Sequence, residues 1–277
     1  MKRWISDRKS RRGAACGFTI LELLVATAVT MLMSVLLLSM VQYFIDGYRR
    51  TQNSMSRQGD SSFALDQIVQ DIENRVIPNS PNAEGLRATW TNVDQGKGVW
   101  LTLLSTATDR DPNMNNGATR AISYRIDKKN PIDGSVNQPA YALYRSIASA
   151  KHTFENAMST NVSNLQSDYW NNLPAAPAPT PTQPTDKDNF IAPNIVEFQV
   201  RFLRADNGKW TQPESTVSIS RNGAIVDGVA IPGGFKRAEV SLMTISPEGA
   251  TKLAAGMSIQ EVITRYSQTS VRQTAAF

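Results

Sequence analysis

The sequence predicts an α+β protein in which a long N-terminal α-helix, with a transmembrane first half, packs its second half on an antiparallel β-sheet domain. Three features support this prediction. An apolar run extends from Phe18 to Ile45, an amphipathic helical pattern continues over residues 46–77, and residues 78–277 are rich in strand-forming side chains. With 277 residues, the chain has room for an anchor and one domain of ordinary size.

The basic charge of the chain is concentrated at its N-terminus. The sequence contains 29 Lys and Arg residues against 24 Asp and Glu residues, a formal net charge of +5. Residues 1–17 hold six basic residues and one acidic residue, so the rest of the chain is neutral overall. A charge confined to a short leader does not provide the basic surface of a nucleic-acid-binding domain, and no nucleic-acid partner is expected.

The apolar run has the length and composition of a membrane-spanning helix. About 20 apolar residues cross a bilayer, and Glu22 is the only charged residue between Phe18 and Ile45. The Ser and Thr residues of the run are tolerated because their hydroxyl groups can bond back to the helix backbone. Since the basic leader precedes the run and the next basic residue is Arg49, the positive-inside rule places the N-terminus in the cytoplasm and residues 78–277 outside the inner membrane.

Other interpretations explain the N-terminus less completely. A secretory signal peptide has an apolar region of about 7–15 residues and then a small-residue cleavage motif, and no such motif closes this run near Asp46. A lipoprotein cysteine follows its apolar region, whereas Cys16, the only cysteine, precedes it. A plain transmembrane anchor leaves Glu22 unexplained, because ionisable residues inside membrane helices are costly and usually functional. A shallow Glu22 that reaches the lipid headgroups is the alternative.

The residues from Gly17 to Ala26, GFTILELLVA, resemble the processing and methylation motif of type IV prepilins and type II secretion pseudopilins. The resemblance covers the basic leader, the Gly-Phe pair, a glutamate at the fifth position after the glycine and the apolar run. It implies that prepilin peptidase cleaves after Gly17 and methylates the amine of Phe18. It also implies that Glu22 pairs with the N-terminal amine of a neighbouring subunit, which is reasonable because a carboxylate in an apolar environment needs a cationic partner.

The resemblance further implies the partners of the chain: other pilin or pseudopilin subunits, an inner-membrane assembly platform and membrane lipid. The late segment FKRAEVSLMTIS, Phe235–Ser246, resembles the end of J-type pseudopilins and W-type minor pilins, and the N-terminal opening is similar to that of C-type Verru_Chthon cassette proteins. The sub-family stays open. A minor pilin or pseudopilin is favoured over a major pilin, since the chain is long and lacks two late cysteines.

The second half of the predicted helix carries one apolar stripe. Its members recur at helical spacing and are Leu65, Ile68, Val69, Ile72 and Val76. The acidic residues of this segment, including Asp71, lie largely off the stripe. The pattern is too short for a coiled-coil seam, so packing on a globular domain is expected. Pro78 ends the pattern, which extends the helix to Ile77, with Gly47 and Gly59 as its weak points.

The segments after the helix are expected to form a β-rich domain. In Ile195–Arg204 the alternation of side chains is typical of a half-buried antiparallel strand. Asp206-Asn207-Gly208 and Asn222-Gly223 are turn signals, and Ser246 is a suitable N-cap for a short helix that Gly256 closes. The expected strands are Leu86–Val93, Gly98–Ser105, Thr119–Asp127, Ala140–Ile147, Ile195–Arg204, Thr216–Arg221 and Phe235–Ser246.

A proline-rich segment, residues 173–189, is expected to be a surface loop inside this domain. Its prolines favour an extended, solvated conformation. A domain boundary at the segment is the alternative that stays open. The loop is favoured because only about 90 residues follow it, and because the strands before it lack enough partners.

One loop is a weak candidate for a calcium site, and no other cofactor is expected. Oxygen-bearing side chains occur at every second residue in TDRDPNMNNG, a spacing that can wrap a calcium ion. These residues are Asp109, Asp111, Asn113 and Asn115. Met114 and Arg120 stand where an EF-hand has Gly and Glu. A polar turn held by Asx hydrogen bonds is the alternative.

The sequence predicts a structural subunit and not an enzyme. His152 is the only histidine, so the serines have no second possible base, and no catalytic or nucleotide-binding motif stands in its required context. The predicted role is a minor pilin or pseudopilin of a type IV pilus or a type II secretion pseudopilus. The alternative is a membrane-tethered extracytoplasmic binding or adhesion module.

Overall fold

The computed structural model describes residues 19–79, 84–93, 96–106, 119–129, 140–147, 153, 190–274 and 277. The chain divides into two compact units, Met1–Gln52 and Asn53–Phe277, which we call the anchor unit and the β domain. Helix α1, Ile20–Glu73, begins in the first unit and ends in the second. The two units are described separately below.

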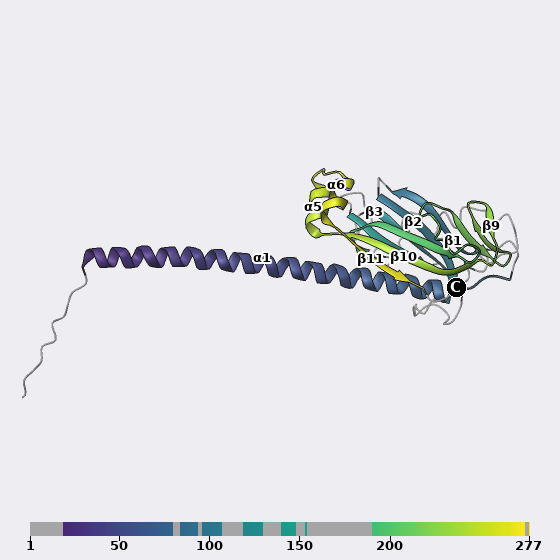
Figure 1. Ribbon diagram of the computed structural model, residues 1–277, viewed down its shortest axis with the longest axis horizontal. Helices are drawn as coiled ribbons and strands as arrows, with labels where there is room; N and C mark the ends of the chain where they lie inside the picture. Colours follow the sequence, from purple (N-terminus) through teal and green to yellow (C-terminus); the bar gives the residue numbers. More distant parts are fainter. Residues whose placement is uncertain are drawn as a thin grey trace, which may run out of the picture. The chain divides into compact units, whose positions relative to one another are not determined.

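The described part of the β domain forms one large sheet, and its architecture confirms the predicted α+β fold (Figure 1). The strands are β1 Glu84–Val93, β2 Gly96–Ser105, β3 Arg120–Lys129, β4 Ala140–Ile147, β5 Phe190–Pro193, β6 Ile195–Arg204, β7 Val217–Ser220, β8 Gly223–Val226, β9 Val229–Ile231, β10 Phe235–Ile245 and β11 Ser267–Gln273. The seven expected strands are all present, with bounds that differ by a few residues. The expected list omits β5, β8, β9 and β11.

The strands are arranged in the order β11-β10-β6-β2-β1-β7-β8-β9, and β3, β4 and β5 form a branch that starts at β2. The branch arises because two different strands, β6 and β3, pair with the same edge of β2. Its Lys97 and Gly98 pair with β6, while Leu101–Ser105 pair with β3. The β2–β6 ladder is parallel, and the other described ladders are antiparallel. Strands on both sides of residues 148–189 therefore belong to the same sheet, because β4 pairs with β5.

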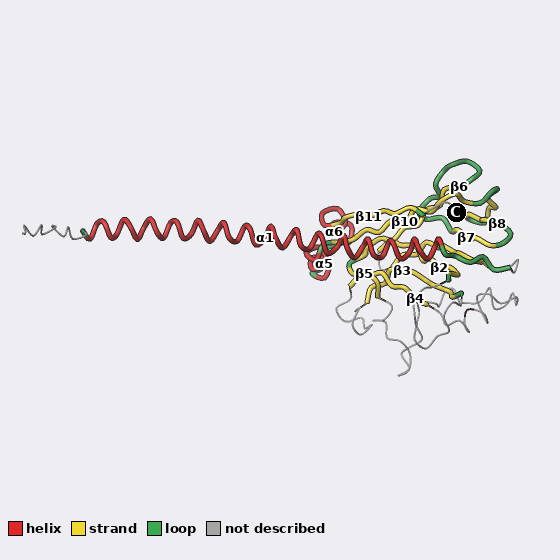
Figure 2. The backbone as a smooth tube through the Cα atoms, turned by 90° about the horizontal axis from the view of Figure 1, so that it is seen from below, coloured by secondary structure: helices red, strands yellow, loops and turns green. Residues whose placement is uncertain are grey.

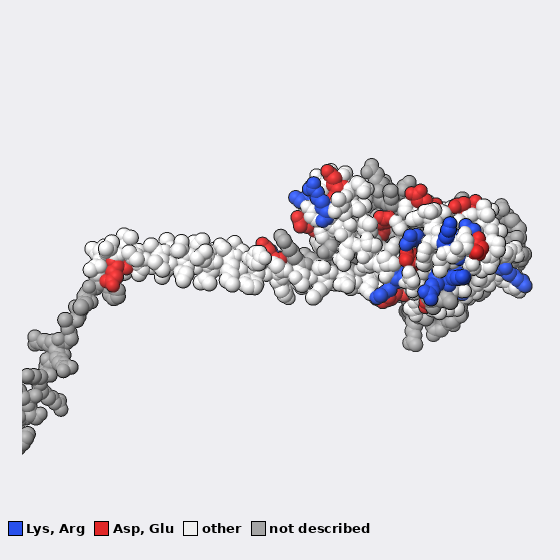
Figure 3. All heavy atoms as spheres, in the orientation of Figure 1, with Lys and Arg blue, Asp and Glu red and all other residues white. Residues whose placement is uncertain are grey.

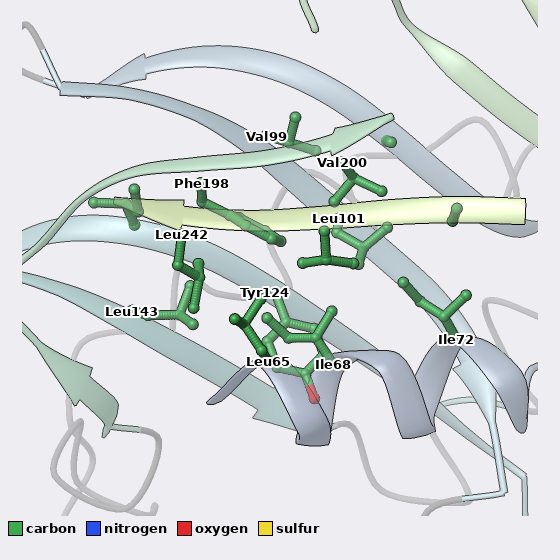
Figure 4. Close-up of a cluster of buried hydrophobic side chains, with 14 of the residues drawn as sticks. Leu65, Ile68, Ile72, Val99, Leu101, Tyr124, Leu143, Phe198, Val200 and Leu242 are labelled. Atoms are coloured by element: carbon green, nitrogen blue, oxygen red, sulfur yellow. The ribbon is translucent and has the colours of Figure 1, made fainter. Parts of the chain in front are cut away.

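The part of α1 that belongs to the β domain lies along the sheet (Figure 2). Leu65, Ile68 and Ile72 of the predicted stripe are at most 1% exposed. They meet side chains from several strands, among them Leu101 and Phe198 (Figure 4). Burial of this stripe and of the facing strand residues accounts for the position of the helix, since each large apolar side chain contributes about 1.5–3 kcal/mol when fully buried.

The predicted alternation in β6 is confirmed, although Ile195 is also buried and one neighbour of the strand, β2, pairs with it in parallel. Val196, Phe198, Val200 and Phe202 are at most 3% exposed and face the core, while Glu197, Gln199 and Arg201 alternate with them and are partly exposed. Such period-two burial follows from the pleat of a strand with one buried face.

The end of α1 differs from the prediction. The helix ends at Glu73 and not at Ile77. Arg75 pairs with Ser105 in an antiparallel bridge, in which Val76 N–H donates to the carbonyl oxygen of Leu104 at 2.6 Å. Pairing with the edge of β2 thus replaces the last predicted helical turn. The helix continues through Gly47 and Gly59, the two predicted weak points.

Two short helices follow β10 at one end of the sheet (Figure 1). The first, α5 Pro247–Ala254, is the expected one: the Ser246 hydroxyl accepts a hydrogen bond from Gly249 N–H at 3.0 Å, and Gly256 follows with φ 95°. The second, α6 Ile259–Tyr266, was not expected. Its capping box joins Ser258 and Glu261, a Ser-x-x-Glu signal that the sequence contains.

Gly249 is the position where α5 and α6 approach most closely. A Cβ atom there would lie 2.7 Å from Tyr266 Cβ and 3.2 Å from Val262 Cγ1. Because neither neighbour is the far end of a flexible side chain, Gly249→Ala requires a shift of α6. We expect this substitution to lower the free energy of unfolding by about 1–3 kcal/mol, the usual cost of overpacking, in thermal unfolding of the full chain in a mild detergent.

Gly59→Ala is the matched control for this prediction. Gly59 is exposed within α1, and a Cβ atom at this position would have no neighbour within 4 Å. The substitution should therefore raise stability by about 0.5–1 kcal/mol through the higher helix propensity of alanine. Equal effects of both glycine substitutions would show that the α5–α6 contact is not rigid.

Candidate membrane anchor and assembly site

The anchor helix begins with a capped turn that contains Glu22. The Thr19 hydroxyl accepts a hydrogen bond from the Glu22 backbone N–H at 3.2 Å, and the Thr19 carbonyl accepts the first helical bond from Leu23 N–H. Thr19 is thus the N-cap, and Glu22 stands at the third helical position. A carboxylate in the first turn is stabilised by the positive end of the helix dipole. The Thr-x-x-Glu spacing is also the signature of a capping box. The sequence contains this signal, but the prediction of the helix did not use it.

The surface of the anchor helix is apolar on all sides. From Ile20 to Arg49 it is long and apolar enough to cross a membrane, and an 18-residue stretch of it has a mean hydropathy of 2.3. Its large apolar side chains are exposed within the anchor unit, from 45% for Ile45 to 86% for Ile20. Figure 3 shows this helix as a nearly uninterrupted uncharged surface. A helix that is apolar all round requires an apolar environment, as a membrane anchor or a signal segment has.

The hydroxyl groups of the anchor bond back to the helix, as the sequence predicts. Thr30 Oγ1 donates to the carbonyl oxygens of Ala26 and Thr27, at 3.0 and 2.9 Å, and Ser34 Oγ donates to that of Thr30 at 2.8 Å. Thr27 and Ser39 form the same kind of bond one helical turn back. These bonds satisfy the hydroxyl groups inside the helix, so their burial in lipid leaves no unpaired donor.

Several predicted site residues lie outside the described residues. These are Gly17, Phe18, the calcium candidates Asp109, Asp111, Asn113 and Asn115, and His152. Processing at Gly17 and calcium binding therefore stay predictions. Among the described residues there is no group of three or more His, Cys, Asp or Glu side chains that could hold a metal ion.

A buried polar cluster joins α1 to the sheet, and the sequence interpretation did not find it. Asp71 of α1, Tyr124 of β3 and Arg145 of β4 are 3%, 0% and 6% exposed. Asp71 Oδ2 accepts hydrogen bonds from the Tyr124 hydroxyl and from Arg145 Nε at 3.0 Å, and Arg145 Nη2 lies 2.9 Å from the same oxygen. Figure 4 shows the Tyr124 hydroxyl pointing from the sheet toward α1. The expectation that Asp71 lies off the packed face is therefore wrong.

The surroundings of the cluster keep Tyr124 neutral. Burial raises the pKa of Tyr124 well above its usual value, and the negative charge of Asp71 raises it further, against the opposing charge of Arg145. The neutral phenol can donate to the carboxylate, while Arg145 supplies the countercharge. Asp71 and Arg145 form a buried ion pair, the Tyr124 hydroxyl adds a hydrogen bond, and together these contacts link α1 to β3 and β4.

Comparisons with known proteins give a structural similarity but no sequence match. No family model matches the chain, and no curated protein matches it. Among solved structures it is similar to a type IV-like pilin from Thermus thermophilus, with 11% sequence identity and a TM-score of 0.36. The similarity covers 79% of this chain and 96% of that one. At this identity and TM-score it assigns no role to any residue.

Proposed function

We propose that this protein is a structural subunit, a minor pilin or pseudopilin, of a type IV pilus or a type II secretion pseudopilus. The observation that carries the proposal is the start of α1. The capped helix begins at Thr19–Ile20, directly after the Gly17-Phe18 pair of the motif, and places one carboxylate in the first turn of an otherwise apolar helix.

In this role the chain enters the inner membrane with its basic leader in the cytoplasm and the β domain on the other side. Prepilin peptidase cleaves after Gly17 and methylates Phe18. The anchor helix then leaves the lipid and packs against the helices of other subunits at an assembly platform. The exposed apolar side chains of residues 20–45 supply the driving force for packing, and Glu22 pairs with the amine of a neighbouring Phe18.

Several observations agree with a structural role in preference to an enzymatic one. The fold is a long helix followed by a large, mainly antiparallel sheet. Positive and negative side chains are interspersed on the face of the β domain that Figure 3 shows, which does not favour a nucleic-acid partner. A binding function of the β domain is the second candidate, and the cleft described below favours it.

The proposal is tested by the N-terminus of the mature protein. Cells with prepilin peptidase should yield a chain that begins at Phe18 and carries one added methyl group, as measured by mass spectrometry of the purified protein. Cells without the peptidase should yield a chain that keeps residues 1–17. Retention of the leader in the presence of the peptidase would contradict the proposal.

A further inference from the structure

A cleft of about 530 Å³ opens in the β domain at the end where α1 terminates. Its walls come from four places: the residues after α1, the β7–β8 hairpin, the segment from β9 to the start of β10, and Phe277. The lining residues used below are Arg75, Ile77, Ile219, Ile231, Gly233 and Phe277. The volume lies in the range of ligand-binding pockets, about 300–1,000 Å³.

Arg75 has the only charged side chain that lines the cleft within the described part of the chain. Its Nη1 donates to the carbonyl oxygen of Ile72 at 3.2 Å, and its Nε is buried without a hydrogen-bond partner. No described carboxylate forms an ion pair with this guanidinium. Burial lowers the pKa of Arg75 from its usual value, with no neighbouring charge as a further cause. Among the described residues, the side chain is thus a partly buried cation without an acidic side chain as its partner.

The guanidinium is held in place by an aromatic cluster. Its central carbon lies 3.6 Å from the ring centroid of Phe277, a cation–π contact. The Phe277 ring packs edge-on against Phe202 and Phe235, with centroid distances of 5.7 and 6.4 Å, and its backbone N–H donates to the carbonyl oxygen of Lys236. A cation fixed in this way loses little conformational entropy when it binds an anion.

The remaining walls are mainly aliphatic side chains and backbone, and the polar side chains of Ser220 and Asn222 also line the cleft. Ile77, Ile219 and Ile231 contribute aliphatic side chains, and the turn at Gly233 and Gly234 has positive φ angles of 73° and 69° that suit glycine. Because both residues are glycines, the rim of the cleft at this turn consists of backbone alone. An apolar wall around a single cation strengthens its attraction for an anion, because the local dielectric constant is lower than that of water.

We propose that this cleft binds the carboxylate of an acidic side chain on a partner protein, within a segment whose flanking residues are apolar. A single planar guanidinium matches one carboxylate in charge and in geometry, whereas a phosphate group with about two negative charges would leave excess charge against apolar walls. The flanking apolar residues of the partner would contact the isoleucine walls. The inference is independent of cleavage and methylation at the N-terminus.

The test uses the full chain, labelled with ¹⁵N, in a neutral detergent. The probe is the peptide acetyl-Gly-Leu-Glu-Leu-Gly-amide, and its control contains Gln in place of Glu. We expect the glutamate peptide to cause saturable shifts of the Arg75 Nε–H resonance and of the Gly233 and Gly234 amides. The glutamine peptide should bind at least about tenfold more weakly, because a hydrogen bond to a charged group is lost.

Variants locate the site. Arg75→Gln should weaken binding of the glutamate peptide at least about tenfold, while Arg75→Lys, which keeps the charge, should weaken it less. Arg265→Gln removes the same charge from the exposed face of α6 and should leave affinity unchanged. The proposal is overturned if the two peptides bind the unmodified chain equally, if the shifts do not saturate, or if Arg75→Gln and Arg265→Gln have the same effect. The peptide comparison needs no variant, so a folding defect in Arg75→Gln leaves the test decisive.

Discussion

Replacement of Asp71 by alanine is expected to lower the free energy of unfolding by about 3–5 kcal/mol, because it removes a carboxylate that pairs with the buried guanidinium of Arg145. The carboxylate accepts hydrogen bonds from both Tyr124 and Arg145, and all three side chains are at most 6% exposed. For a domain of this size the loss corresponds to a fall in melting temperature of roughly 10 °C. Thermal unfolding of the full chain in a mild detergent, followed by near-ultraviolet circular dichroism, measures it.

A second acidic residue of the same helix provides the control. Asp66 pairs with Arg272 of β11 at 3.2 Å, but its side chain is 65% exposed. Exposed pairs contribute about 0–1 kcal/mol, so Asp66→Ala should have a small effect. If Asp71→Ala and Asp66→Ala destabilised the chain equally, the Asp71 cluster would not be desolvated.

The double variant Asp71→Leu with Arg145→Met separates the stability of the fold from the cost of an unpaired charge. It removes both ions and fills the space with apolar side chains. Stability should return to within about 1–2 kcal/mol of the original chain, since an apolar replacement of a buried ion pair is often neutral or stabilising. Recovery would mean that the buried pair adds little net stability compared with an apolar replacement of similar size.

The parts of the fold that were predictable are those that depend on local pattern. The alternation in Ile195–Arg204 fixes which side chains face the core, because a strand has a period of two. Ser246 and Gly256 mark the ends of α5 through capping and positive φ, both of which involve only neighbouring residues. The stripe of Leu65, Ile68 and Ile72 likewise identifies the packed face of α1.

Apart from α6 and the Thr19 cap, whose local signals were overlooked, the main missed features depend on residues distant in sequence. Asp71 is about one turn beyond Ile68 and lies beside the apolar stripe of α1. From the helix sequence alone, a charged residue at such a position is expected to be exposed to solvent. Only its partners, 53 and 74 positions further along, make its burial possible. The cleft at Arg75 is a similar case, because it combines the end of α1, a hairpin and Phe277. The end of the helix at Glu73 was missed for the same reason, since pairing with β2 replaces the last turn.

The predicted roles of Gly17 in processing and of Glu22 in assembly can be tested by substitution. We expect Gly17→Ala to abolish cleavage of the leader, and Glu22→Ala to leave cleavage intact but to reduce filament assembly on the order of a hundredfold. The second effect rests on the proposed function. Without the carboxylate, the amine at Phe18 of a neighbouring subunit is left in an apolar environment, and breaking such a pair typically costs about 3–5 kcal/mol.

The structure offers a second explanation for an assembly defect in Glu22→Ala, and the experiment must distinguish it from the loss of charge pairing between subunits. Glu22 stands in the first turn of α1 beside the Thr19 cap, so it could act through the helix dipole alone. Thr19→Ala removes the cap and keeps the carboxylate, at a cost of about 1 kcal/mol. Cleavage is measured by mass spectrometry, and assembly by the amount of each variant in sheared or sedimented filaments. If Thr19→Ala reduced assembly as much as Glu22→Ala, the role of the carboxylate would be to stabilise the first turn of the helix. If Thr19→Ala reduced assembly less than about tenfold, the larger loss in Glu22→Ala would be due to the lost charge pairing between subunits.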